Sequence, residues 1–117
     1  MATVSSHTLN GADGSHAGDI AVSLINRNTN EVLFEAAMDS GGRLVQEIEP
    51  AQIDVTASYE LVFQTGPYWA SQPHPGSDVR AIEEVVIRFS MPDPEARYHM
   101  PVILSPNSYS VWWSQPE

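Results

Sequence analysis

Apolar residues recur at every second position within short stretches of the chain, and turn-forming residues separate these stretches. This period of two is typical of strands that bury one face and expose the other. The runs that show it best are Ile20-Val22-Leu24, Val32-Phe34-Ala36-Met38, Tyr59-Leu61-Phe63 and Val85-Ile87-Phe89. The pattern predicts eight strands, near residues 3–9, 19–26, 31–38, 43–48, 58–65, 83–90, 97–105 and 108–114.

The segments between these strands suit tight turns. Asn10-Gly11 and Ser40-Gly41-Gly42 are examples of the residue types that hairpins and strand corners require. Only GPYWASQ favours a helix, with Pro67 at its first position. Pro101 falls inside the predicted strand 97–105, although proline normally occupies a sheet edge or a bulge. We expect one all-β domain over residues 1–117, folded as a two-sheet sandwich of about eight strands with one short helix.

Charge and composition narrow the classes of partner. Fifteen acidic and five basic residues give a formal net charge of −10, which disfavours binding to nucleic acid or to an anionic membrane surface. The absence of cysteine excludes disulfides, a thiolate nucleophile and sulfur-ligated zinc. The first residues form neither a basic nor an apolar leader segment, and no apolar run is long enough to span a membrane. We expect a cytoplasmic protein.

Two histidines and one arginine are candidates for a catalytic role. His7 lies on a predicted strand with Ser5 and Leu9 on the same face, and His99 shares its face with Pro101 and Ile103. Arg43 follows the glycine pair of SGGR. Taken alone, each residue is better explained as a solvated or packed side chain. His16 and His74 lie in turn-rich segments, where a solvated imidazole is expected, and the histidine spacing predicts no metal site.

The order of four segments resembles one known family. SSHTLNGADG, SGGR, YELVFQTGPYWASQ and YHMPVILSPNSYS are similar, in this order and over essentially the whole chain, to segments of the transthyretin-like proteins, specifically the 5-hydroxyisourate hydrolases. The resemblance implies a transthyretin-like sandwich and a homotetramer built as a dimer of dimers around a channel. It also implies a catalytic site without cofactor or metal at the positions of His7, Arg43 and His99.

The chain departs from this family at its end. The family usually ends in Tyr-Arg-Gly-Ser, but here Trp112, Trp113, Ser114 and Gln115 stand in those places. Arg97 also replaces the first histidine of a usual His-Tyr-His run. We expect the substrate to contact the residues on the faces of His7, His99 and the last strand, namely Leu9, Pro101, Ile103, Ser110, Trp112, Ser114 and Gln115.

The sequence therefore predicts a hydrolase of a cyclic amide or ureide, of the 5-hydroxyisourate hydrolase type. One histidine would act as the general base and Arg43 would stabilise the oxyanion. Two alternative functions remain open. One is a biosynthetic enzyme on the same scaffold whose cyclic substrate is larger and packs against Trp112, and the other is a non-enzymatic small-molecule carrier. The tryptophans could also simply pack a subunit interface.

Overall fold

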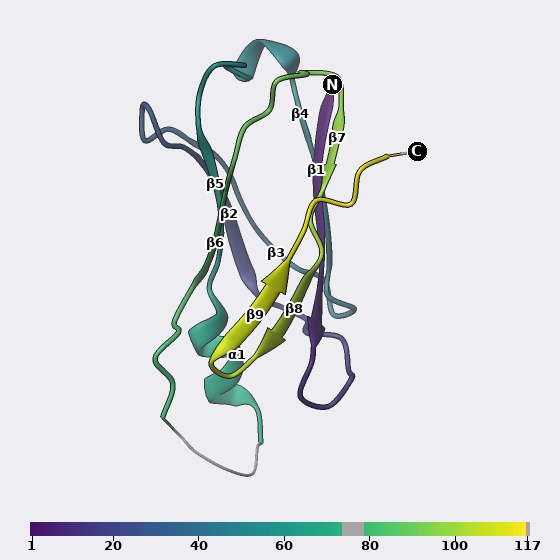
Figure 1. Cartoon of the computed structure of the whole chain (residues 1–117), viewed down its shortest axis with the longest axis vertical. Coiled ribbons are helices and arrows are strands. Elements are labelled where there is room, and N and C mark those ends of the chain that lie inside the picture. The colour runs from purple at the N-terminus through teal and green to yellow at the C-terminus, as the bar shows by residue number, and fades with distance from the viewer. Residues whose placement is uncertain (74–78, 117) are drawn as a thin grey trace.

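Two β-sheets packed face to face make up the molecule in the computed structural model, which describes residues 1–73 and 79–116 (Figure 1). The first sheet has the order β4-β1-β8-β9, and β7 also pairs with β1. The second has the order β3-β2-β5-β6. The strands of the first sheet are β1 (Ala2–Asn10), β4 (Arg43–Ile48), β7 (Arg97–His99), β8 (Val102–Ser105) and β9 (Ser108–Val111). Those of the second are β2 (Ala21–Asn26), β3 (Val32–Ala37), β5 (Tyr59–Phe63) and β6 (Val85–Phe89).

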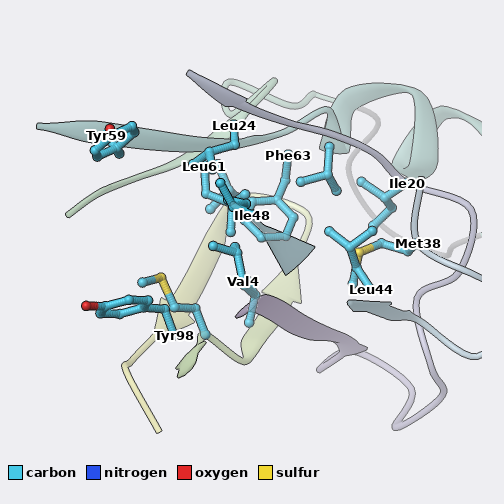
Figure 2. Close-up of a cluster of buried hydrophobic side chains, with 14 of the residues drawn as sticks. Val4, Ile20, Leu24, Met38, Leu44, Ile48, Tyr59, Leu61, Phe63 and Tyr98 are labelled. Carbon is cyan, nitrogen blue, oxygen red and sulfur yellow. The ribbon is translucent and has the colours of Figure 1, made fainter. Parts of the chain in front are cut away.

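The core fills the space between the sheets, where the alternating apolar residues of both sheets meet (Figure 2). Val4 from the first sheet and Leu24, Leu61 and Phe63 from the second are fully buried. The predicted inward faces are confirmed with one exception. Val32 is 46% exposed, because the pairing of β2 with β3 shifts register at this end of the strand.

The predicted strand 97–105 is interrupted at Pro101 and forms two strands, β7 and β8, which both run parallel to β1. Proline has no N–H to donate, so the hydrogen-bond ladder cannot continue through this position. The register is nevertheless the same on both sides of the gap, since Ser5 lies opposite His99 and Thr8 lies opposite Val102. The chain thus follows β1 in one line, as a single strand would.

The helix α1 (Thr65–Ser71) begins earlier than predicted, so Pro67 is its third residue and not its first. Proline is tolerated there because the first four N–H groups of a helix lack partners within it. A short 3-10 helix, η1 (Pro50–Gln52), was not expected. Within the described residues, no helix is long and apolar enough to span a membrane.

Candidate active site

The outer face of the first sheet, opposite the core, carries the predicted site residues. Along β1, alternate residues from Ala2 to Asn10 are buried, whereas Ser5, His7 and Leu9 are only partly buried. Their side chains therefore point away from the second sheet. The residues of neighbouring strands that pair with these three lie on the same face, and strand register decides which of them become neighbours.

His7 and Arg43 are direct cross-strand partners in the antiparallel pair of β1 and β4. On the other side of β1, the register shared by β7 and β8 places Pro101 next to His7. The β8–β9 register, which continues as far as the isolated pair of His99 and Ser114, places Trp112 next to Pro101. Arg43, His7, Pro101 and Trp112 thus form one row across the sheet, about 5 Å apart from strand to strand.

His99 occupies the adjacent row, beside Ser5 of β1. Its Nδ1 atom lies 2.8 Å from the Ser5 hydroxyl oxygen, and its carbonyl oxygen accepts a hydrogen bond of 2.8 Å from the Ser114 N–H. The chain end is therefore fixed beside His99 of the same molecule. On the opposite side of the His7 row, Leu9, Ile103 and Ser110 form a further row.

A tight turn places Arg43 at the start of β4. The Asp39 carboxylate accepts hydrogen bonds of 2.9 Å from the N–H groups of both Gly41 and Arg43. Gly42 between them has a φ of +76°, a conformation that favours glycine. Its carbonyl oxygen accepts a 2.8 Å hydrogen bond from the N–H of Thr8, which follows His7. The turn and β1 are thereby locked together at the level of the site.

His16 is exposed, as the sequence pattern predicted, and it also contacts this cluster. Its Nδ1 atom lies 2.8 Å from Nε2 of His7 and 3.1 Å from the Gly41 carbonyl oxygen. Because a carbonyl can only accept, this geometry favours a proton on His16 Nδ1, directed toward both acceptors. The loop between Leu9 and His16 turns the chain back, and these two residues form an isolated β-bridge. This loop is the feature that could have revealed the contact between His16 and His7.

Both site histidines are biased toward the neutral form. Burial, then the Arg43 guanidinium and then His16 lower the pKa of His7 from its ordinary value of 6.5, against the opposing effect of a hydrogen bond to the Gly41 backbone. Burial and then Arg43 lower the pKa of His99. A neutral imidazole can accept a proton, and a guanidinium that stays charged can donate hydrogen bonds to an oxyanion.

The chain end separates two clefts. Ser5, Arg97, His99, Ser114, Gln115 and Pro116 line a cleft of about 290 Å³ on the outer face. Trp113 points to the other side, where its ring stacks on Tyr98 at a centroid distance of 5.9 Å and lines an apolar cleft of about 610 Å³. Gln115 borders both clefts.

The structure thus brings most predicted site residues onto one continuous face. His7, Arg43 and His99 lie in adjacent rows, and Leu9, Pro101, Ile103, Ser110, Trp112 and Ser114 surround them. Pro101 is buried, whereas Ile103 and Trp112 are 38% and 46% exposed. Gln115 lies at the rim, and His74 lies outside the described residues. Among the described residues, no group of three or more His, Cys, Asp or Glu side chains is placed to hold a metal ion.

Comparison with known proteins gives concordant matches over nearly the whole chain. The family model described as HIUase/Transthyretin family matches residues 4–113. The 5-hydroxyisourate hydrolase 2 of Rhizobium meliloti (strain 1021) is 29% identical over 93% of this chain and 92% of its own length. The 5-hydroxyisourate hydrolase structure from Klebsiella pneumoniae has a TM-score of 0.78 at 24% identity, covering 98% of this chain and all of that one. Transthyretin from Sparus aurata has a TM-score of 0.81 at 20% identity, with 97% of each chain covered. At these identities, the two structures establish a likeness of fold.

Proposed function

Since this chain belongs to the HIUase/transthyretin family, we propose that it is a hydrolase of the 5-hydroxyisourate hydrolase type, which opens a cyclic amide or ureide. The observation that carries the proposal is the pairing of His7 with Arg43 across β1 and β4, with His99 in the adjacent row. Two neutral imidazoles and one permanent cation on one face are the groups that hydrolysis of a ring amide requires.

In the proposed reaction, His7 or His99 takes a proton from water as the water oxygen attacks the ring carbonyl carbon. A positioned general base of this kind contributes roughly a hundred- to ten-thousand-fold to the rate. Negative charge then develops on the carbonyl oxygen, where Arg43 donates hydrogen bonds to it. The C–N bond breaks as the imidazolium returns its proton to the departing nitrogen, and a carboxylate and an amine or ureido group remain.

The lowered histidine pKa values support this assignment. A base must be unprotonated before it can act, and burial together with Arg43 keeps both imidazoles neutral at and above neutral pH. The Ser5 hydroxyl beside His99 Nδ1 can hold one tautomer, so that Nε2 of His99 is directed toward the reacting atoms. His16 acts differently on His7: as the donor to His7 Nε2 it places the proton of neutral His7 on Nδ1, so His99 is the imidazole better able to accept a proton.

We further propose that the chain works as a homotetramer, a dimer of dimers, with partner copies covering this face. The proposal is supported by the family resemblance and by the exposure of Val45, Ile103 and Trp112 around the site in the single chain. Light scattering coupled to size-exclusion chromatography tests it. A mass of four chains is expected, and a monomer at micromolar concentration contradicts it.

The decay of freshly generated 5-hydroxyisourate, followed by its ultraviolet absorbance, tests the activity. We expect the protein to accelerate the decay, His99→Asn to remove most of the acceleration, and Arg27→Gln to keep it. Arg27 is the matched control because it contacts Glu60 on the second sheet and lies away from the site. An unchanged decay rate in the presence of the native protein would refute the assignment.

The exposed Trp112 favours one alternative, in which the same residues open or rearrange a larger ring. Trp112 lies two positions from His7 in the same row and presents a flat apolar surface on which a second ring can stack. Under this alternative, Trp112→Tyr changes the preference among ring substrates, whereas under the first assignment it does not. A carrier, in contrast, would bind its ligand unchanged.

A further inference from the structure

Within the part of the chain that the structure describes, two arginines near the site face the solvent without a carboxylate partner. The five basic residues of the chain are all arginines. Arg27 and Arg88 both contact the Glu60 carboxylate, at 2.8 and 3.0 Å. Within residues 1–73 and 79–116, no ion pair is formed by Arg43 or Arg97. In a chain of net charge −10, an arginine without an acidic partner is a feature that needs an explanation.

Arg97 lies on the same face as the site. It is two residues before His99 on β7 and pairs with Thr3 of β1, so its row is the next one after the row of His99. Two residues of a strand span about 6.6 Å. His99 therefore lies between the row of Arg97 and the row of Arg43. On the other side of β1, Thr3 pairs with Glu47 of β4. Glu47 is therefore two strands away from Arg97, and no ion pair between these two described residues is present.

The cleft beside Arg97 offers further hydrogen-bond donors. It holds about 290 Å³, and the polar residues Ser5, Ser114 and Gln115 are among those that line it. The Ser114 N–H bond to the His99 carbonyl fixes the chain end that forms one wall. A guanidinium presents a planar pair of donors that matches the two oxygens of a carboxylate, and such bonds are stronger than those between neutral groups.

We propose that this cleft is a carboxylate subsite, in which Arg97 binds the carboxylate of a ligand whose ureide or ureido group lies against His99, His7 and Arg43. This inference rests on the proposed function, because that function identifies the other part of the ligand as a ureide or ureido group. The carboxylate has two possible sources. It is either a substituent of the cyclic substrate or the group created when water adds to the ring carbonyl carbon and the ring nitrogen leaves.

Three small probes separate these sources. Dihydrouracil is a neutral cyclic ureide, dihydroorotate is the same ring with a carboxylate, and 3-ureidopropionate is the acid formed when dihydrouracil is opened. Their binding to the native protein is measured by titration, with the ring signals of His99 in the NMR spectrum as the reporter of location. The variants are Arg97→Gln and, as a control with the same change of charge, Arg27→Gln.

We expect at least one acid to bind more tightly than dihydrouracil by roughly ten- to a hundredfold, the range for hydrogen bonds to a charged group. Arg97→Gln should abolish that preference, and Arg27→Gln should preserve it. A preference for dihydroorotate assigns the carboxylate to the substrate, and a preference for 3-ureidopropionate assigns it to the product. Either supports the subsite.

Equal binding of all three probes, or a preference that survives Arg97→Gln, overturns the subsite. The binding result is independent of catalysis. If the acids bind through Arg97 but 5-hydroxyisourate decays at its uncatalysed rate, the proposed activity fails and the subsite stands. If decay is accelerated but Arg97→Gln leaves probe binding unchanged, the subsite fails and the activity stands.

Discussion

Replacing Gly42 with alanine perturbs the turn that holds Arg43 beside His7. Gly42 has a φ of +76°, and an added Cβ would lie 2.5 Å from the Thr8 carbonyl oxygen and 3.0 Å from that of Ala17. Both contacts are with backbone, so neither can be relieved by rotating a side chain. The Thr8 carbonyl accepts a 2.9 Å hydrogen bond from the Ala17 N–H, and the Thr8 N–H donates to Gly42. The clash therefore displaces two hydrogen bonds of β1.

Gly14 provides the control for this substitution. Its φ is +80°, but nothing lies within 4 Å of an added Cβ. Both substitutions carry the cost of a left-handed conformation, about 1–2 kcal/mol, less about 0.4–1 kcal/mol for the reduced freedom of the unfolded chain. Gly42→Ala alone also loses two hydrogen bonds, about 0.5–1.5 kcal/mol each. We expect Gly42→Ala to be less stable than Gly14→Ala by about 1–3 kcal/mol.

Urea unfolding followed by circular dichroism measures both free energies of unfolding. Gly42→Ala should also lower kcat/KM for ring hydrolysis, because Arg43 shifts relative to His7, and Gly14→Ala should leave it near the native value. Equal stability of the two variants would refute the argument, since it would mean that the close approach of Gly42 to β1 does not constrain the turn.

Three further outcomes are expected. Since burial and then Arg43 lower the pKa of His7 and His99, Arg43→Gln should raise both pKa values toward 6.5 in an NMR titration; unchanged values contradict the cluster. Because these lowered pKa values make the unfolded chain bind more protons, the stability they contribute is present above pH 6.5 and is lost as the pH falls through the folded-state pKa values. The double variant His7→Asn/His99→Asn should therefore lose less stability than the native protein between pH 7 and 5, as measured by urea unfolding at each pH. The Tyr98 hydroxyl donates to the Asp93 carbonyl at 2.8 Å and accepts from its N–H at 3.0 Å, so Tyr98→Phe should cost about 1–3 kcal/mol in the same assay. A cost below about 0.5 kcal/mol would show that water replaces both bonds.

The β-sandwich was predictable from the sequence because period-two alternation reports directly which face of each strand is buried, and the resemblance of four segments to a known family implied its transthyretin-like form. The pattern located the inward residues of β2 and β5 for this reason. It did not predict that the strand is interrupted at Pro101 and forms two strands, although the missing N–H of proline indicated a break in the hydrogen-bond ladder. The end of β3 was misjudged at Val32 because a register shift between two strands leaves no trace in the alternation of either one.

The faces of the site residues were also readable from alternation, but their neighbours were not. Which residue of β7 lies beside which residue of β1 depends on the register of strands more than ninety positions apart in the chain. Only that register places Trp112 in the row of His7 and Arg97 in the row next to His99. The contact of His16 with His7 was missed because it depends on the return of a loop, which strand periodicity does not describe.

The central claim is that His7, Arg43 and His99 act together on one substrate. A double-substitution cycle tests it most directly, by comparing kcat/KM for 5-hydroxyisourate in the native protein, His7→Asn, His99→Asn and the double variant. Residues that act as a unit give non-additive losses. We expect each single variant to lose most of the activity and the double variant to lose little more. Single variants with near-native kcat/KM, or losses that multiply as for independent residues, would contradict the account.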